Sequence, residues 1–153
     1  MHDETGFPKN TPAATRTLAD RLRTKLTDNE DDIVKVDRYR MDDAEIAVVA
    51  FGGAARTAYE AVDIAREAGI RAGLLRPVTI WPFAGRAMRE TATRVKAILV
   101  HELNCGQYVR EVESAVEGRV PVSLYAKYDN ESATPDELLA EIKKTAKQLE
   151  GGR

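Results

Sequence analysis

The segment AEIAVVAFGGAARTAYEAV, residues 44–62, decides the fold of this chain. Residues 46–51 form an almost unbroken apolar run, which is typical of a strand that is buried on both faces. Gly52 and Gly53 end this run, and alanines then recur at helical spacing over residues 54–65. A buried strand that passes through a tight turn into an amphipathic helix predicts the first half of a βαβ unit.

The alternation of strands and helices continues towards the carboxyl end. Short connections between them predict a largely parallel sheet with helices on both faces. The last helix carries a capping box, in which the Thr134 hydroxyl and the Glu137 carboxylate each accept a backbone N–H. We therefore expect strands at residues 46–51, 71–75, 97–100 and 121–125, and helices at residues 54–69, 83–93, 109–118 and 135–149.

The first 32 residues do not follow this pattern. Residues 1–11 are polar and predict a linker or arm, and Pro12 suits the first position of a helix. The helix would carry an apolar stripe, which either packs on its own domain or covers a neighbouring domain or subunit; its members are Leu18, Leu22 and Leu26. Residues 33–39 predict a short strand at a sheet edge. The expected division is an arm and helix at 1–32 and an α/β domain at 33–150.

The composition excludes several classes of protein. The chain has 153 residues, 43% of them apolar and 31% charged, and a net charge of −2, so no basic surplus suggests nucleic acid. One cysteine, Cys105, cannot supply a multi-thiolate iron–sulfur or zinc site. No apolar run approaches the ~20 residues that span a bilayer, and the amino terminus does not look like a secretory signal. We expect a cytoplasmic protein with no membrane contact.

Ligands of parallel sheets bind at the carboxyl ends of the strands, and the first loop there contains Gly52, Gly53 and Arg56. Free N–H groups at the start of the following helix could hold a phosphate of a nucleotide or of CoA. However, neither a G-x-G-x-x-G nor a P-loop pattern is present. The simpler interpretation is that the glycines permit a tight turn and close helix–sheet packing.

The second loop, LRPVTIWPF at residues 75–83, is dense in large apolar side chains. Arg76 is the only charged residue in it. The loop is either a satellite core around a buried Trp81 or an exposed anchor, because tryptophan and arginine are favoured at interface hot spots. We regard Arg76, Trp81 and Phe83 as candidate interface or loop-organising residues.

The third loop contains His101, Glu102, Asn104, Cys105 and Gln107. Adjacent residues of a strand point to opposite faces, so His101 and Glu102 cannot act together. A Cys105–His101 catalytic pair would require the loop to fold back on the strand. We expect no catalytic or metal-binding residue here. Glu102, Asn104 and Gln107 are predicted to form a hydrogen-bonding cluster that shapes the loop or meets a partner.

Three segments carry a family resemblance: AEIAVVAFGGAARTAYEAV, then GIRAGLLRPVTIWPF, then VHELNCGQYVREVE. Their order and spacing resemble the second domain of the α subunit of 2-oxoacid:ferredoxin oxidoreductases, most of all the 2-oxoglutarate type. The arm, with His-Asp-Glu-x-Gly at residues 2–6, is similar to the family's interdomain segment. Ala84 stands where the family commonly has proline, and Phe51 and Gly53 replace tyrosine and serine, which weakens any inference about the oxoacid.

The resemblance implies a domain like the carboxy-terminal domain of transketolase. Such a domain is a three-layer α/β/α sandwich with a five-stranded, mostly parallel sheet and one antiparallel edge strand, here near residues 33–39. The family converts a 2-oxoacid and CoA to acyl-CoA and CO₂ and reduces ferredoxin. Thiamine diphosphate, Mg²⁺, iron–sulfur clusters and CoA would be bound elsewhere in the complex, by the preceding α-subunit domain, the β subunit or other chains.

We therefore expect a structural and assembly domain with no bound cofactor. Its partners would be the preceding α-subunit domain and the β subunit, with ferredoxin reached through the complex. The alternative is a stand-alone nucleotide- or CoA-binding α/β module that uses Gly52, Gly53 and Arg56.

Overall fold

A single five-stranded sheet forms the centre of the computed structural model, which describes residues 2–129 and 131–151. The strand order is β1-β3-β2-β4-β5. Strands β2 to β5 run parallel, and β1 pairs antiparallel with β3 at one edge, which confirms the expected mixed sheet. The strands are β1 (Val36–Tyr39), β2 (Ile46–Ala50), β3 (Ala72–Pro77), β4 (Ala97–Glu102) and β5 (Val122–Ala126).

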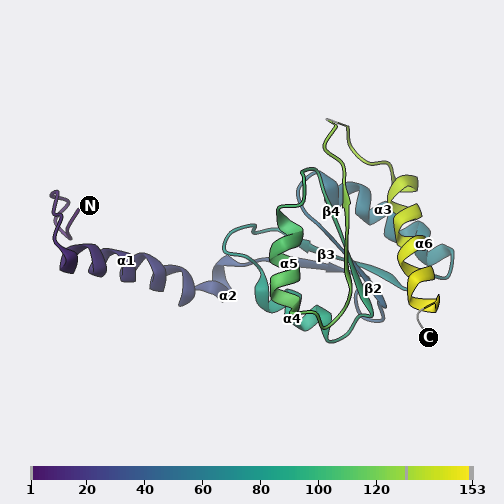
Figure 1. Cartoon of the computed structure of the whole chain (residues 1–153), viewed down its shortest axis with the longest axis horizontal. Helices are drawn as coiled ribbons and strands as arrows, with labels where there is room; N and C mark the ends of the chain where they lie inside the picture. Colours follow the sequence, from purple (N-terminus) through teal and green to yellow (C-terminus); the bar gives the residue numbers. More distant parts are fainter. Residues whose placement is uncertain (1, 130, 152–153) are drawn as a thin grey trace.

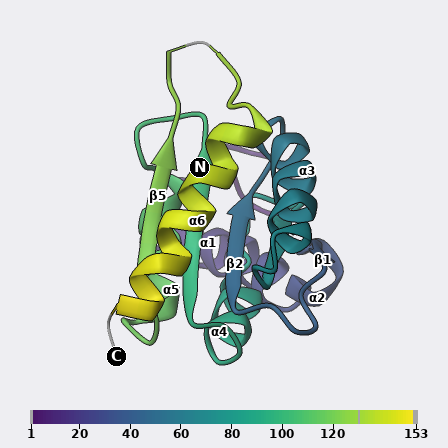
Figure 2. The ribbon, with the colours of Figure 1, turned by 90° about the vertical axis from the view of Figure 1, so that its right-hand side faces the viewer.

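Four helices cover the two faces of this sheet and give the predicted three layers (Figure 2). Every residue of β2 and β4 is buried, because both strands lie inside the sheet and between helices. Val48 and Leu99 pack with one helical layer, and Val49 and Ile98 pack with the other. The first layer contains α3 (Ala54–Glu67) and α6 (Pro135–Gly151), and the second contains α4 (Gly85–Ala92) and α5 (Tyr108–Val116).

The amino-terminal helix α1 (Pro12–Thr27) projects away from this body (Figure 1). The Thr11 side chain caps it by accepting the N–H of Ala14, as its sequence suggests. None of its residues is buried, so its leucine stripe is not packed on the sheet. In the described part of the chain, no helix combines the length and the apolar character that a bilayer span requires.

Several expected boundaries were wrong, two of them at helices. Residues 30–33 form a short helix, α2 (Glu30–Ile33), and the edge strand starts only at Val36. Three acidic residues in this single turn suit the positive amino end of a helix, which the strand prediction ignored. The helix predicted from residue 83 starts at Gly85, because Phe83 packs against the core instead.

The edge strand β1 is tied to the helices by its own side chains. The Tyr39 hydroxyl donates to the Asp63 carboxylate of α3 at 2.9 Å, and Arg40 Nε lies 2.6 Å from Asp63 Oδ1. Arg38 on the same strand reaches Glu90 of α4. Arg40 adopts a positive φ of 52°, which turns the chain sharply after the strand.

Gly73 of β3 lies directly under this turn. A Cβ at Gly73 would lie 2.6 Å from the Arg40 carbonyl oxygen and 2.7 Å from Met41 Sδ. The absence of a side chain therefore permits the close approach of the two backbones.

Candidate functional site

The carboxyl edge of the sheet is built from the loops that follow β2, β3 and β4. Tyr108, the first residue of α5, joins them, because its ring centroid lies 4.8 Å from that of Phe51 and 5.2 Å from that of Phe83. Phe51 follows β2, and Phe83 ends the loop after β3. No sequence pattern singles out Tyr108, since one aromatic residue at a helix start carries no signal of its own.

The Tyr108 hydroxyl is enclosed by this aromatic cluster. The residue is buried, and its hydroxyl makes no hydrogen bond with any other described residue. Burial raises the pKa of the Tyr108 phenol, so the side chain stays neutral at physiological pH. Its position supports a packing role at the centre of the three loops.

Glu102, at the end of β4, is fully buried and holds the start of α5. Its two carboxylate oxygens accept the backbone N–H groups of Tyr108 at 2.8 Å and of Val109 at 3.2 Å. These N–H groups belong to the first turn of a helix and have no partner inside it. An acidic group at this end is also favoured by the helix dipole. Glu102 thus fixes where α5 begins.

Asn104 shapes the short loop between Glu102 and α5. Its side-chain oxygen accepts the N–H of Gly106 at 3.0 Å and that of Gln107 at 2.9 Å, in an Asx-type turn. Gly106 has a φ of +89°, which a glycine adopts without strain. Gln107 takes part in this turn through its backbone, and the residue itself is exposed.

The loop after β3 presents Trp81 to solvent, with 75% of the residue exposed. Trp81 is therefore not buried in a satellite core, while Phe83 is partly buried against the core. Thr79 fixes the loop, because its hydroxyl donates to the Ile33 carbonyl at 2.8 Å. Arg76 is partly buried, and its Nε makes no hydrogen bond with a described residue.

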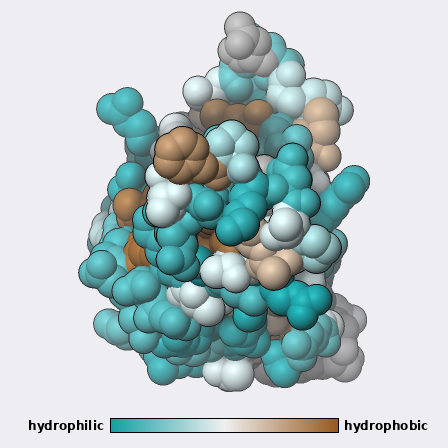
Figure 3. Space-filling model, turned by 90° about the vertical axis from the view of Figure 1, so that its left-hand side faces the viewer, coloured by the Kyte–Doolittle hydropathy of each residue, from teal (hydrophilic) through white to brown (hydrophobic). Residues whose placement is uncertain are grey.

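Exposed apolar side chains gather on this edge. We call them the carboxyl-edge surface: Val78, Ile80, Trp81 and Leu103. The end of the molecule that carries α1 is mainly hydrophilic, with hydrophobic residues in separate patches (Figure 3). Exposed apolar groups on an organised loop are typical of a surface that meets another protein.

The glycine turn after β2 shows no built ligand site among the described residues. Gly52 adopts a φ of +55°, as a tight turn requires, and Gly53 starts α3 without a side-chain cap. The side chain of Leu103 lies close by, with Cδ1 3.9 Å from the position of a Cβ on Gly53. Arg56 is exposed.

His101 and Cys105 do not form a catalytic pair. His101 is fully buried, its Nδ1 lies 3.0 Å from the Tyr125 carbonyl oxygen, and its ring stacks on that of Tyr125. The Nε2 atom makes no hydrogen bond with a described residue, whereas Cys105 is exposed on the loop. Burial lowers the pKa of His101. Among residues 2–129 and 131–151, no group of three or more acidic, histidine or cysteine side chains could hold a metal ion.

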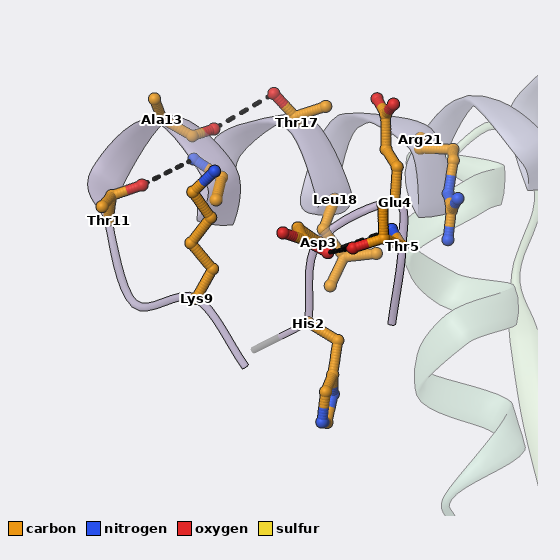
Figure 4. A pocket seen from close by; sticks show the side chains of 11 residues that line it. His2, Asp3, Glu4, Thr5, Lys9, Thr11, Ala13, Thr17, Leu18 and Arg21 are labelled. Atoms are coloured by element: carbon orange, nitrogen blue, oxygen red, sulfur yellow. Dashed lines mark hydrogen bonds between the residues drawn. The ribbon is translucent and has the colours of Figure 1, made fainter. Parts of the chain in front are cut away.

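A further hollow lies between the arm and α1 (Figure 4). Asp3 orders the arm by accepting the N–H and hydroxyl of Thr5, and these hydrogen bonds lower the pKa of its carboxyl. In Figure 4 the His2 ring points away from α1. Most of its lining residues are of polar type, although their carbon atoms supply much of the surface: His2, Asp3, Glu4, Thr5, Lys9, Thr11, Ala13, Ala14, Thr17, Leu18 and Arg21.

The fold and this edge define a class of protein domain. A mixed five-stranded sheet with an antiparallel edge strand and helices on both faces is the architecture of the carboxy-terminal domain of transketolase. The matched transketolase-type chain is a split-gene transketolase in an inactive tetramer, with a TM-score of 0.62 over 72% of this chain and 40% of that one, at 20% identity.

The family follows from the sequence comparison. Residues 44–138, more than half of the chain, match the family described as pyruvate:ferredoxin oxidoreductase core domain II. The chain belongs to this family. This confirms the resemblance inferred from the three segments between residues 44 and 113.

Its curated relatives include subunits of 2-oxoacid oxidoreductases. The 2-oxoglutarate synthase subunit KorA of Methanothermobacter marburgensis is 38% identical over 142 residues, which is 92% of this chain and 38% of that protein. The KorA subunit of Methanocaldococcus jannaschii is 34% identical over 137 residues, 90% of this chain and 37% of that protein. This chain therefore spans well under half the length of these relatives.

A solved structure shows the same fold within a larger chain. The 2-oxoglutarate:ferredoxin oxidoreductase of Magnetococcus marinus, determined with 2-oxoglutarate, coenzyme A and succinyl-CoA bound, matches 94% of this chain with a TM-score of 0.75. The match covers 25% of that chain at 19% identity. At this identity, it supports the fold and no more.

Proposed function

We propose that this chain is the second domain of the α subunit of a 2-oxoacid:ferredoxin oxidoreductase of the 2-oxoglutarate type. The parent enzyme would convert the 2-oxoacid and CoA to acyl-CoA and CO₂ and pass the electrons to ferredoxin. In this proposal the chain is a structural and assembly domain. The observation that carries it is the identity to 2-oxoglutarate synthase subunits over 92% of the chain.

The carboxyl-edge surface is the proposed contact with the rest of the enzyme. Trp81 supplies a large exposed anchor on a loop that Thr79 holds in place. Glu102 and Asn104 fix the loop after β4 through backbone N–H groups, so little flexibility is lost when a partner binds. Arg76 and Gln107 complete the proposed contact. The partners would be the preceding α-subunit domain and the β subunit, and ferredoxin would be reached through the complex.

Residues 1–32 are the proposed linker to the preceding domain. α1 buries none of its residues in the described chain, and its last two turns carry Leu22 and Leu26 beside Arg21, Arg23 and Lys25. A helix of 16 residues is only marginally stable in water without a partner for its apolar face. The leucine stripe and the basic residues of α1 would suit a partner surface that is apolar at its centre and acidic at its margins.

The side chains of this chain do not fit the cofactors of such an enzyme. An iron–sulfur cluster requires several thiolates, and the sequence contains one cysteine. The described residues also lack a group of carboxylates that could bind Mg²⁺ of a thiamine diphosphate site. We propose that thiamine diphosphate, Mg²⁺, iron–sulfur clusters and CoA are bound by other domains or subunits.

The proposal can be tested on the native protein. An antibody to this chain should capture from cells a subunit that is larger than 153 residues, together with a partner that contains thiamine diphosphate and iron–sulfur clusters. The captured complex should reduce a viologen dye in the presence of CoA and a 2-oxoacid, with 2-oxoglutarate as the best substrate. A free chain without partner or activity would contradict the proposal.

The contact surface can be tested in the same complex. Trp81→Ala should reduce assembly with the partner at least tenfold, because hot-spot residues contribute about 2 kcal/mol or more. Tyr128→Ala is the matched control, since Tyr128 is an aromatic residue of similar exposure that follows β5, and β2 and β4 separate β5 from β3 in the sheet. Equal assembly of both variants would remove Trp81 from the interface.

Ligand binding by the chain alone provides a second check. We expect no thermal shift with CoA or thiamine diphosphate, because the Gly52–Gly53 turn has no converging polar side chains among the described residues. A shift with CoA that Arg56→Ala removes would instead support a nucleotide- or CoA-binding module.

A further inference from the structure

β5 is an edge strand that contains no charged residue, and its outer side is unpaired. No described strand lies beyond β5 in the sheet, and Figure 2 shows it at the rim. Residues 120–126 are Val-Pro-Val-Ser-Leu-Tyr-Ala, without a lysine, arginine, aspartate or glutamate. Exposed edge strands normally carry charges or prolines that prevent pairing with another chain. Pro121 lies just before the strand, so it does not protect it.

The ladder with β4 shows which residues of β5 face outward. Ile98 N–H donates to the Pro121 carbonyl at 3.0 Å, and Lys127 N–H donates to the Glu102 carbonyl at 3.1 Å. Alternate residues of a strand bond to the same neighbour. Positions 121, 123, 125 and 127 therefore face β4, and the N–H and C=O groups of Val122, Leu124 and Ala126 point away from it.

Apolar side chains accompany these free backbone groups. Leu124 is 40% exposed at the centre of the strand, and Tyr128 is 69% exposed just beyond its end. The nearest cation, Lys127, has a side chain that is mostly covered and paired with Glu137 at 3.1 Å. No described charge on the strand itself would oppose another strand.

We propose that this edge pairs with the same edge of a second copy of the chain, antiparallel about a two-fold axis at Leu124. In that register Leu124 faces its own counterpart, and Val122 faces Ala126 of the other copy. These facing residues have N–H and C=O groups that point outward, so they form the hydrogen-bonded pairs of the new ladder, and Ser123 and Tyr125 form the non-hydrogen-bonded pairs between them. Two five-stranded sheets would become one sheet of ten strands across the dimer.

The charges that flank the strand are also complementary in this register. Arg119, which pairs with Glu117 at 2.9 Å, and Asp129 lie beyond the two ends of β5, each five positions from Leu124, so the two-fold axis brings the Arg119 end of one copy beside the Asp129 end of the other. This self-complementarity favours a second copy over an unrelated strand. A single pair of edge strands buries little area compared with a standard interface of about 1,600 Å². We therefore expect a weak dimer that dissociates on dilution.

The test is light scattering of the full chain over a dilution series. The wild type should pass from dimer to monomer as it is diluted, and Leu124→Lys should stay monomeric, because the axis places the two lysines directly opposite each other. Leu22→Lys is the matched control, since it is the same change at an exposed leucine of α1, and it should dimerise like the wild type.

A mixing experiment checks that the partner is a second copy. Leu124→Lys and Leu124→Glu should each be monomeric alone and should form a heterodimer when mixed, because opposite charges then face each other. Unfolding by urea verifies that both variants fold. A monomeric wild type at every concentration, a dimer that survives Leu124→Lys, or a mixture that stays monomeric would each overturn the proposal. These outcomes are independent of the oxidoreductase assignment, which the capture experiment tests.

Discussion

Within β1, the side chains of Arg38 and Tyr39 reach across to α4 and α3. β5 itself carries no charged residue, and among the described residues its only comparable contact comes from Lys127, one position past its end, which pairs with Glu137 of α6.

β5 is held from the side of β4 instead. Buried His101 of β4 makes a hydrogen bond with the Tyr125 carbonyl, and the backbone ladder continues as far as the bond from Lys127 N–H to the Glu102 carbonyl. Both edges are stable within the monomer. Only β1 carries charged side chains that oppose pairing with a strand of another chain. The way an edge strand is held therefore determines whether it can pair with a second copy, as proposed for β5.

The largest effect on the free energy of unfolding is expected at the buried carboxylate of Glu102, at the end of β4 and next to β5. Glu102→Leu would leave the N–H groups of Tyr108 and Val109 buried without an acceptor, at a cost of about 1–3 kcal/mol each. Urea unfolding measures this loss. Glu102→Gln keeps one acceptor oxygen and should lose less. Equal stability of the Leu and Gln variants would show that these N–H groups do not depend on the carboxylate.

On the β1 side, backbone packing is the sensitive feature. Gly73→Ala would place a Cβ against the Arg40 carbonyl and Met41, and we expect a loss of about 1–3 kcal/mol in the free energy of unfolding. Gly53→Ala is the control, because its φ of −63° is ordinary and its added Cβ makes only normal contact with Leu103. Similar losses for the two variants would contradict the close approach at Gly73.

Acidification should lower the free energy of unfolding through His101, which contacts Tyr125 of β5. Burial lowers its pKa, helped by the charge of Lys127, while the Tyr125 carbonyl, Glu102 and Glu137 act in the opposite direction. The unfolded chain therefore binds a proton more readily than the folded chain. The resulting stability is fully present above the unfolded pKa of 6.5 and is lost as the pH falls through the folded pKa, with a slope of at most about 1.4 kcal/mol per pH unit.

The pH effect is measured as the difference between two unfolding profiles. His101→Asn removes the titrating group and should flatten the profile below pH 6.5 relative to the wild type. His2→Asn, at the exposed histidine of the arm, should reproduce the wild-type profile. If the profiles of the wild type and His101→Asn stay parallel, the buried histidine is not the cause.

The smallest effect is expected where a side chain of β1 is removed from its partner. Tyr39→Phe deletes the hydrogen bond to Asp63 and should cost about 0.5–1.5 kcal/mol. Tyr128→Phe changes an exposed hydroxyl near the other edge and should cost nothing measurable. A neutral Tyr39→Phe would mean that the Tyr39 hydroxyl does not help to hold the edge strand.

Much of the fold was predictable because it depends on local patterns. The apolar runs of β2 and β4, the alanine face of α3 and the capping box at Thr134 and Glu137 each specify an element directly, and both capping hydrogen bonds are present. β3 extends beyond its predicted end because residues 76 and 77 pair with β1, which is a contact between distant segments. Such a contact leaves no mark in the local sequence.

The candidate site was less predictable than the fold. The types of residue in the third loop suggested a hydrogen-bonding cluster, and strand alternation placed His101 and Glu102 on opposite faces, but neither pattern showed that Glu102 would hold the start of α5. The position of Tyr108 between Phe51 and Phe83 could not be predicted, because it depends on three loops meeting. The exposure of Trp81 was one of two open alternatives.

The separation of α1 from the body has a consequence for protease sensitivity. Because α1 buries no residue, its hydrogen bonds can open locally without unfolding of the sheet. Its amide hydrogens should exchange with solvent far faster than those of β2, and trypsin should cut after its exposed arginines and Lys25 before it attacks the sheet. Limited digestion would then release the arm and leave an intact α/β domain, unless a bound partner shields the helix.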